Sequence, residues 1–185
     1  PAWSPDGRTL AITLSKDGNP DLYLINLRGE IIERLTQNAG INVSPSWSPD
    51  GRQLAFVSDR SGSPQVYILD LQTKAVRRLT YQGNYNTSPS WSPKGDLIAY
   101  AGSYKGQYHI FNISPDGGTP LRVTRSWGDH ESPCWSPDGR QIVFTRKRNG
   151  KQQVCAIFRN GKGLRVLFPS TGNQSFPRWS PRLKS

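Results

Sequence analysis

The sequence predicts an all-β fold made of repeated four-stranded antiparallel sheets, with one sheet for each segment of 44 residues. One tryptophan motif recurs every 44 residues, at Trp3, Trp47, Trp91, Trp135 and Trp179. The 18 Gly and 15 Pro among 185 residues exceed the usual share of these residues and predict frequent turns. The segments between the turns have no amphipathic helical period, so we expect no substantial helix.

The first element of each segment is a strand that ends in the tryptophan motif, which reads PAWSPDG, PSWSPDG, PSWSPKG, PCWSPDG and PRWSPRL. Ser-Pro-Asp-Gly suits a tight turn because Pro fixes φ, Asp bonds back to the backbone and Gly accepts a positive φ. We expect the glycine that ends each turn to form a bulge at the start of the second strand. These glycines are Gly7, Gly51, Gly95 and Gly139.

Three more strands complete each segment. The second is an apolar run that reads LAITL, LAFVS, LIAYAG and IVFTR, and it leads to a turn containing Gly18, Gly62, Gly106 or Gly150. The third reads DLYLINL, QVYILDL, YHIFNI and QVCAIF, with a period of two. The fourth reads IIERLT, AVRRLT, LRVT and LRVLF. Because the two central strands are apolar nearly throughout, each sheet must be covered on both faces by neighbours.

Four antiparallel strands in about 44 residues are the pattern of a β-propeller blade. We therefore expect a single, partial β-propeller domain over residues 1–185, with blades at 1–43, 44–87, 88–131 and 132–175 and the first strand of a fifth at 176–185. The repeated tryptophan is expected to pack between neighbouring blades. The chain could close as a four-bladed ring, form part of a larger ring, or assemble from two copies, and we favour part of a larger ring. An incomplete ring would favour self-association, because it exposes strand edges.

At PxWSPDGxxLAF…YxxDLxxxxxxRLT the chain resembles the TolB-type propeller repeat, a relative of the WD repeat. The resemblance covers the whole chain and implies a six-bladed, non-catalytic platform for protein partners in the periplasm. In that family, the platform links a trans-envelope complex to a peptidoglycan-associated lipoprotein. Related repeats occur in peptidases of the prolyl-oligopeptidase type and in pectin-degrading lyases, so a propeller domain of a larger enzyme is the alternative. Lys94, Leu183 and the sequence RVLF depart from the pattern.

The loops that join the fourth strand to the next segment are the first candidate binding site. Five residues before each tryptophan stand the polar residues Asn42, Asn86, His130 and Gln174. If the first strand of each blade lines a central channel, these positions form a polar ring at its mouth. We expect this ring, with Tyr85, Asp129 and Glu131 beside it, to bind a protein or peptide partner. The competing interpretation is that these side chains only cap turns.

The net charge of +11 is concentrated in the last third of the chain. Residues 132–185 contain 11 Lys and Arg but a single Asp, and four of the cations lie at one turn of the fourth blade: Arg146, Lys147, Arg148 and Lys151. This basic patch is suited to an acidic partner, an anionic polymer or a membrane surface. The pattern argues against nucleic acid, because no stacking aromatic residues alternate with the basic ones. A solvated rim is the competing interpretation.

Catalytic chemistry has little support in the sequence. The two histidines, His109 and His130, lie in no known motif, and HExxH, GxSxG, CxxC and phosphate-loop patterns are absent. We therefore predict no enzymatic activity, no cofactor and no metal. Cys134 and Cys155 are expected to be free thiols, because a strand separates them in one sheet.

The location of the protein follows only from the resemblance, which implies an extracytoplasmic compartment. No apolar run is long enough to span a membrane as a helix. The sequence has no Met and shows no signal peptide at its start, so we expect it to begin inside a longer reading frame.

Overall fold

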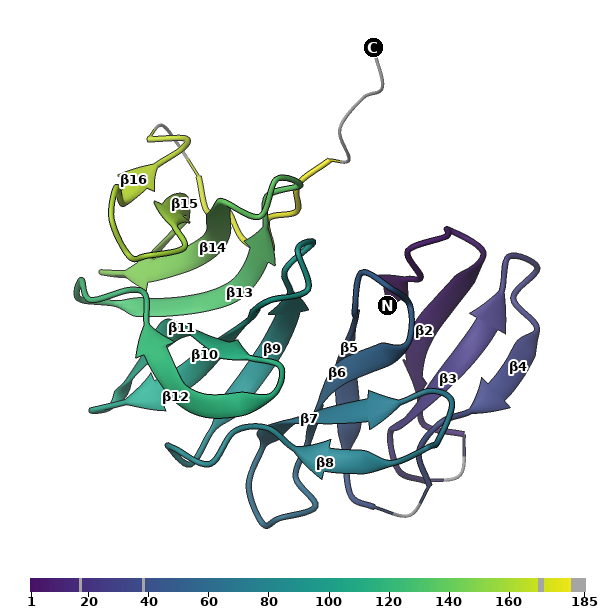
Figure 1. Cartoon of the computed structure of the whole chain (residues 1–185). Helices are drawn as coiled ribbons and strands as arrows, with labels where there is room; N and C mark the ends of the chain where they lie inside the picture. The colour runs from purple at the N-terminus through teal and green to yellow at the C-terminus, as the bar shows by residue number, and fades with distance from the viewer. Residues whose placement is uncertain (17, 38, 170–171, 181–185) are drawn as a thin grey trace. The chain divides into compact units, whose positions relative to one another are not determined.

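The computed structural model describes residues 1–16, 18–37, 39–169 and 172–180. These residues form strands, turns and loops but no helix. The chain divides into two compact units, Pro1–Trp91 and Ser92–Ser185, which we call unit 1 and unit 2. The strands form four antiparallel sheets of four strands each, as the sequence predicts (Figure 1).

Unit 1 contains the first two sheets. The first has the order β1-β2-β3-β4, with β1 (Ala2–Trp3), β2 (Thr9–Leu14), β3 (Asp21–Asn26) and β4 (Ile31–Arg34). The second has the order β5-β6-β7-β8, with β5 (Asn42–Trp47), β6 (Gln53–Ser58), β7 (Gln65–Asp70) and β8 (Val76–Arg78). Each strand therefore pairs with its neighbours in sequence, which is the topology of a propeller blade.

The third and fourth sheets repeat this topology. The third has the order β12-β11-β10-β9, with β9 (Asn86–Trp91) before the division between the units and β10 (Ile98–Tyr104), β11 (Gln107–Ser114) and β12 (Gly117–Arg122) in unit 2. The fourth has the order β13-β14-β15-β16, with β13 (Asp129–Trp135), β14 (Gln141–Arg148), β15 (Lys151–Phe158) and β16 (Arg165–Val166). The last strand of the fourth sheet is thus only two residues long.

The turn after each of Trp3, Trp47, Trp91 and Trp135 is held by a serine and a carboxylate. In the second segment, the Ser48 hydroxyl donates to Asp50 Oδ1 at 2.6 Å and accepts the Gln53 N–H at 2.9 Å. The hydroxyl bond, followed by a bond from the Arg52 N–H, lowers the pKa of Asp50. In the third segment Lys94 stands in place of this aspartate, and Ser92 donates instead to Asp96, at 3.0 Å. The substitution therefore leaves the turn intact.

The turn glycine has the left-handed backbone expected of it, and a separate register shift lies in the first strand of the second and fourth segments. Gly51 has the predicted positive φ, 72°, but the register shift falls between Val43 and Ser46. Four residues spaced 44 apart have φ between 52° and 55°, a left-handed conformation that is uncommon outside glycine: Ser44, Ser88, Ser132 and Phe176. The backbone at Phe176 thus repeats that of the earlier segments, while residues 181–185 of the expected fifth segment lie outside the described part of the chain.

The repeated tryptophan packs between sheets in each unit, as predicted. In unit 1, Trp47 contacts a core that contains Leu22 of the first sheet and Phe56 of the second, and its indole N–H donates to the Ala2 carbonyl at 3.0 Å. In unit 2, Trp135 is 5% exposed in a core that joins the third and fourth sheets. Trp3 is 59% exposed, and its sheet has no predecessor in unit 1.

Both cysteines are free thiols, in agreement with the prediction from strand order. Burial raises the pKa of Cys155, so this thiol is protonated and unreactive at neutral pH. Within the described residues there is no helix that could cross a bilayer.

Candidate functional site

The polar residues predicted to surround a channel mouth are mostly buried. Asn42 and His130 are fully buried and Asn86 is 2% exposed. Asn42 and Asn86 begin β5 and β9, and His130 is the second residue of β13. Each of the three bonds to a polar side chain or backbone group within its own unit. A network of buried polar groups recurs at this position in the first three blades.

In the first blade the centre of the network is Asp21, the first residue of β3, which is fully buried. Its Oδ1 accepts bonds from the Thr36 hydroxyl at 2.7 Å and from Asn42 Nδ2 at 3.0 Å. Thr36 also accepts the Leu22 N–H at 2.9 Å. Arg34 pairs with Asp21 Oδ2 at 2.6 Å. The network therefore ties the third and fourth strands to the loop that starts the next sheet, and it neutralises a buried charge.

The second blade builds the same network with neutral groups. Gln65 replaces the aspartate and is fully buried. Its Oε1 accepts bonds from the Thr80 hydroxyl and from Asn86 Nδ2, both at 2.8 Å. Thr80 accepts the Val66 N–H at 2.9 Å. Carboxylate and amide are thus interchangeable at this position, because both offer an acceptor oxygen to the same two donors.

The third blade places two histidines in the equivalent positions. Thr124 accepts the Ile110 N–H at 2.9 Å and lies 3.3 Å from His109 Nδ1. The ring of His130 stacks on that of His109, with centroids 5.3 Å apart. Burial lowers the pKa of His130 to about 4 and also lowers the pKa of His109. Both rings are therefore neutral at pH 7.

The network is incomplete in the fourth blade. Phe168 occupies the position of the threonine and is 57% exposed. Gln153 occupies the position of Asp21, and its oxygen accepts a bond from Arg146 Nη2 at 2.8 Å. Two atoms, Gln174 Oε1 and Arg146 Nε, are buried without a hydrogen-bond partner among the described residues. The fourth blade thus lacks the hydrogen bonds that the threonine hydroxyl makes in the other three.

These networks give the ring residues a structural role that does not require a partner. Buried amides and imidazoles hold the loop before each first strand, while more exposed neighbours are left to face solvent. Tyr85 is 41% exposed. Asp129 Oδ1 accepts the Tyr108 N–H at 2.9 Å, and Glu131 pairs with Lys147 at 2.6 Å. Binding of a partner at these positions remains a prediction.

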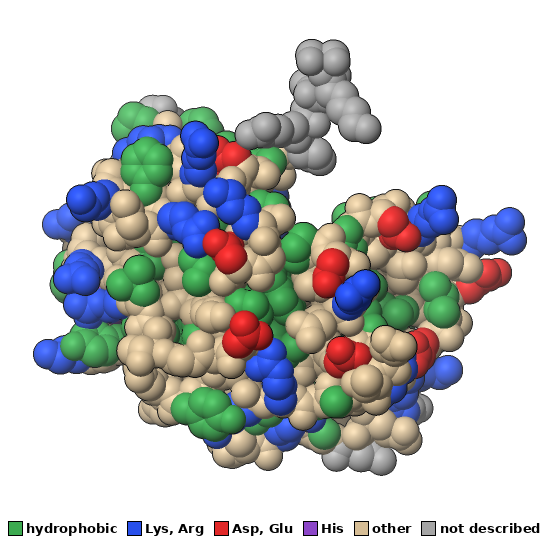
Figure 2. Space-filling view, viewed as in Figure 1, with side chains coloured by type: hydrophobic (Ala, Val, Ile, Leu, Met, Phe, Trp, Pro, Cys, Tyr) green, Lys and Arg blue, Asp and Glu red, His purple; other side chains and the backbone are tan. Residues whose placement is uncertain are grey.

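The structure separates the four cations of the predicted basic patch. Arg146 turns inward to Gln153, and Lys147 is paired with Glu131. Arg148 and Lys151 are exposed near the turn between β14 and β15, and the Arg148 guanidinium lies 5.6 Å from the centroid of the Trp127 ring. Over unit 2, Lys and Arg side chains outnumber acidic ones on the face that Figure 2 shows.

Two exposed aromatic residues of unit 2, each beside a cation, were missed by the sequence patterns. Tyr104 is 40% and Trp127 57% exposed, and the Arg122 guanidinium lies 4.3 Å from the Tyr104 ring centroid. Gly128 lets the Trp127 loop lie against β14, because a Cβ there would come within 2.6 Å of the Lys147 carbonyl oxygen. The only signal in the sequence was that Trp127 stands outside the 44-residue register.

The buried histidines support both of these aromatic residues. The Tyr104 ring meets that of His109 edge-on at 6.2 Å, and the Ser126 hydroxyl, adjacent to Trp127, lies 3.1 Å from His130 Nε2. We name the exposed and half-buried residues at this end of the two sheets the Trp127 face. It comprises Tyr104, Lys105, Arg122, Arg125, Trp127, Lys147, Arg148 and Lys151.

The described residues contain no group of three His, Cys, Asp or Glu side chains that could hold a metal ion. In the Asp129–Glu131 segment, Asp129 accepts a backbone bond, His130 is stacked on His109 and Glu131 pairs with a lysine. The three side chains are thus engaged in different contacts.

Residues 1–183 match the family described as the TolB beta propeller domain. The chain belongs to this family. The match confirms the resemblance inferred from the tryptophan motif and covers every blade of this TolB-type chain.

Curated relatives match short stretches of the TolB-type chain. A TolB homolog of Chlorobaculum tepidum is 50% identical over 40 residues, which are 22% of this chain and 9% of the relative. The Tol-Pal system protein TolB of Ruthia magnifica is 47% identical over 36 residues, 20% of this chain and 8% of the relative. The matched stretches thus span about a tenth of the length of these relatives.

Solved structures match nearly the whole TolB-type chain. TolB from Acinetobacter baumannii superposes with a TM-score of 0.83 at 28% identity, over 95% of this chain and 44% of that chain. A putative TolB from Agrobacterium tumefaciens gives a TM-score of 0.88 at 28% identity, over 97% of this chain and 69% of that chain. An oligogalacturonate lyase from Vibrio parahaemolyticus, 13% identical with a TM-score of 0.54, shares the fold alone.

Proposed function

We propose that the chain is a non-catalytic, extracytoplasmic protein-binding domain, and that the Trp127 face binds an acidic protein or peptide partner. The observation that carries the proposal is the pairing of exposed aromatic rings with guanidinium groups, at 4.3 Å for Tyr104 and Arg122 and 5.6 Å for Trp127 and Arg148. Trp, Tyr and Arg are the residues most enriched at the energetic centres of protein interfaces.

Charge supports an acidic partner. Residues 92–185 contain 15 Lys and Arg against five Asp and Glu, and one of the acids on this side, Glu131, is neutralised by Lys147. A positive surface accelerates encounter with a negative one and disfavours basic competitors. The exposed aromatic rings add contact area at a low cost in side-chain entropy.

The predicted channel-mouth residues enter this proposal in a supporting role. His109 and His130 hold Tyr104 and the Trp127 loop, so they position the face without touching the partner. Asn42 and Asn86 hold the corresponding loops of unit 1. Tyr85, Asp129 and Glu131 remain candidates for direct contact.

Family membership suggests which partner to test. One relative is named as the TolB of a Tol-Pal system, and TolB-type platforms bind a peptidoglycan-associated lipoprotein. We propose that this chain binds the lipoprotein of its own organism in the same manner. Membership in a family of interaction domains, together with the lack of a catalytic motif in the sequence, supports a role without catalysis.

Titration calorimetry with the soluble domain of that lipoprotein tests the proposal. Trp127→Ala and Arg148→Gln should each weaken binding about tenfold or more, the loss typical of an interface centre. Tyr81→Ala is the matched control in unit 1, because Tyr81 is also exposed and also lies beneath a guanidinium, that of Arg78. Equal losses in all three variants, or tighter binding to heparin than to the lipoprotein, would reject the proposed protein partner.

A further inference from the structure

A groove of about 330 Å3 lies in unit 1 between the first two tryptophan turns. Its walls include one aspartate from each turn, Asp6 and Asp50, together with Trp47 at the end of β5 and Leu71 just after β7. The residues that line it all belong to the described part of unit 1. A volume of this size lies at the lower end of the range for small-molecule sites.

The two aspartates bring negative charge to the groove. Asp6 Oδ1 accepts the Ser4 hydroxyl at 2.6 Å and the Arg8 N–H at 3.0 Å, and Asp50 Oδ1 accepts the same two bonds in its own turn. These bonds lower the pKa of both carboxyl groups, and the guanidinium groups of Arg8 and Arg52 add weaker attractions. Both groups are therefore ionised at pH 7. Within the described residues, the second oxygen of each carboxylate accepts no hydrogen bond.

Unit 2 shows which chemical group lies at the equivalent place. Two repeats of 44 residues after Leu71 stands Arg159. Its guanidinium lies 5.7 Å from the centroid of the Trp135 ring, the counterpart of Trp47, and pairs with Asp96 at 2.7 Å. Trp135 is 5% exposed, whereas Trp47 is only half-buried. A guanidinium of the chain itself therefore lies over this tryptophan in unit 2, and a leucine takes its position in unit 1.

The first turn of each pair differs in the same sense. Lys94 stands in unit 2 where Asp6 stands in unit 1, and its alkyl stem lies against the next turn, since a Cβ added at Gly139 would meet Lys94 Cγ at 3.0 Å. At the corresponding Gly51, the nearest atom is Cδ of Pro5, at 3.7 Å. Unit 1 thus has the tryptophan and two acids of this arrangement but a cationic side chain at neither position.

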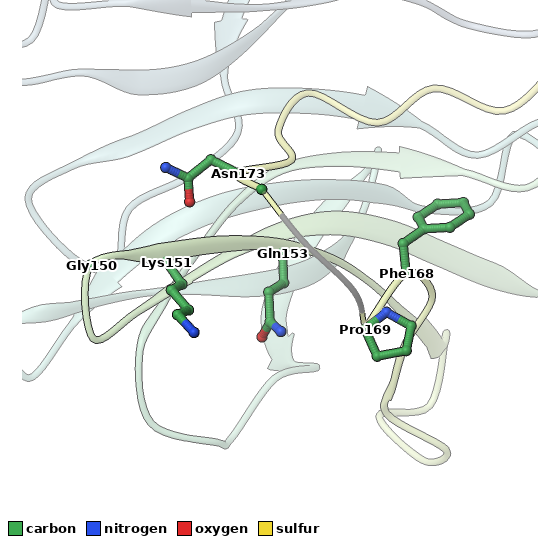
Figure 3. A pocket seen from close by; sticks show the side chains of 7 residues that line it. Gly150, Lys151, Gln153, Phe168, Pro169 and Asn173 are labelled. Atoms are coloured by element: carbon green, nitrogen blue, oxygen red, sulfur yellow. The ribbon is translucent and has the colours of Figure 1, made fainter.

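The surface beside the turn between β14 and β15 has a different charge. Figure 3 shows Lys151 and Gln153 extending from this hairpin in the same direction. The first is positive and the second neutral, so this surface does not attract a cation. The acidic groove of unit 1 is the better site for one.

We propose that the groove of unit 1 binds an alkylguanidinium ion, its planar group against Trp47 and the carboxylates of Asp6 and Asp50, and its stem beside Leu71. A guanidinium stacks on aromatic rings and donates pairs of hydrogen bonds to carboxylates. Free guanidinium compounds and the arginine side chains of peptides share this chemistry. The inference does not rest on the proposed protein partner, because the Trp127 face lies in unit 2.

Small probes test the proposal in the full chain labelled with 15N. Butylguanidinium should shift the indole N–H resonance of Trp47 and the amide resonance of Gly51, with a dissociation constant on the order of 1 mM, as expected for a ligand of this size. Butanol has the same stem without the charge and should leave both resonances in place. Butylammonium should bind more weakly than butylguanidinium, because it has no planar group.

The blocked tripeptide acetyl-Gly-Arg-Gly-amide distinguishes the two sources of the guanidinium group. Binding at least as tight as that of butylguanidinium would assign the groove to arginine within a peptide. Weaker binding of the tripeptide would assign it to a free guanidinium compound. Both results support the proposed chemistry.

Three variants complete the experiment. Leu71→Arg should weaken butylguanidinium binding more than about tenfold, because it places a guanidinium of the chain where Arg159 lies in unit 2. Asp50→Asn keeps the acceptor for the Ser48 hydroxyl but removes the charge, and should weaken binding about fivefold. Asp138→Asn makes the same change in the equivalent turn of unit 2 and should alter binding less than about twofold.

Absence of saturable shifts in the unsubstituted chain would overturn the proposal. So would binding of butanol or butylammonium as tight as that of butylguanidinium, or equal losses in the Asp50→Asn and Asp138→Asn variants.

Discussion

His109 and His130 stack with an interplanar angle of 24° in the interior of unit 2. They occupy positions that hold Gln65 and Asn86 in the second blade, where an amide-to-amide hydrogen bond joins the same strands. Stacking of two neutral rings replaces that bond, and the pair also supports Tyr104 and the Trp127 loop. A surface feature of unit 2 is thus coupled to two buried titratable groups.

The stability of unit 2 should decrease at acidic pH. Burial lowers the pKa of His130 to about 4, and His109, Arg146 and the bond to the Tyr108 carbonyl act in addition, the last in the opposite sense. Because the unfolded state binds the proton more readily, stability is fully present above pH 6.5 and falls as the pH drops toward 4. We expect the free energy of unfolding of unit 2 to fall by about 2–3 kcal/mol between pH 7 and pH 4.5. Urea titrations at several pH values measure this loss.

The double variant His109→Gln, His130→Asn gives the third blade the two amide side chains that the second blade has at these positions. It should fold at pH 7 and show a much smaller loss of stability between pH 7 and pH 4.5, because amides do not titrate in this range. An unchanged pH dependence in the variant would show that other groups cause it.

The threonine of each network should stabilise the fold through the hydrogen bonds of its hydroxyl group. Thr80→Val keeps the shape of the side chain but leaves Gln65 Oε1 short of one donor and the Val66 N–H without its acceptor. We expect a loss of about 1–3 kcal/mol in the free energy of unfolding. Thr73→Val, at an exposed turn, is the control and should stay within about 0.5 kcal/mol of the unsubstituted chain.

The tryptophans of the repeat should differ in their contribution to stability. Trp135 is 5% exposed and lies between two sheets, so Trp135→Ala should cost about 3–5 kcal/mol. Trp3→Ala should cost less than about 1 kcal/mol, since its ring is largely in solvent. Thermal unfolding followed by circular dichroism compares the two. Similar losses of stability in the two variants would contradict the packing role of Trp135.

Binding of an acidic partner should depend on salt. Raising the ionic strength from about 0.05 M to about 0.5 M should lower the association rate roughly tenfold, with a smaller effect on dissociation, because the aromatic contacts are not screened. Stopped-flow measurements separate the two rates. An association rate that is independent of salt would argue against steering by the cations of unit 2.

The sequence predicted the blades well because strand and turn signals are local. The 44-residue spacing, the Ser-Pro-Asp-Gly turns and the apolar central strands each depend on residues close together in the chain. The register shift beside Ser44 was not predicted, because a serine in the left-handed conformation leaves no mark in composition. Its recurrence every 44 residues shows only in the backbone angles.

The candidate site was harder to predict because its residues are distant in the chain. The sequence singled out Asn42, Asn86 and His130, but their burial depends on partners 21 or 22 residues away, such as Asp21 and Tyr108. The polar residue that recurs every 44 residues in the third strand, as Asp21, Gln65, His109 and Gln153, was the available signal for this network. Trp127 had no repeat equivalent, so its pairing with Arg148 could be found only from the structure.

Hydrogen–deuterium exchange of the chain, with and without the soluble lipoprotein domain, shows where the partner binds. If the partner binds the Trp127 face, protection is concentrated in residues 104–107, 122–128 and 147–151, which carry that face. Protection concentrated in unit 1, or at the turns between the third and fourth strands of unit 2, would contradict binding at that face.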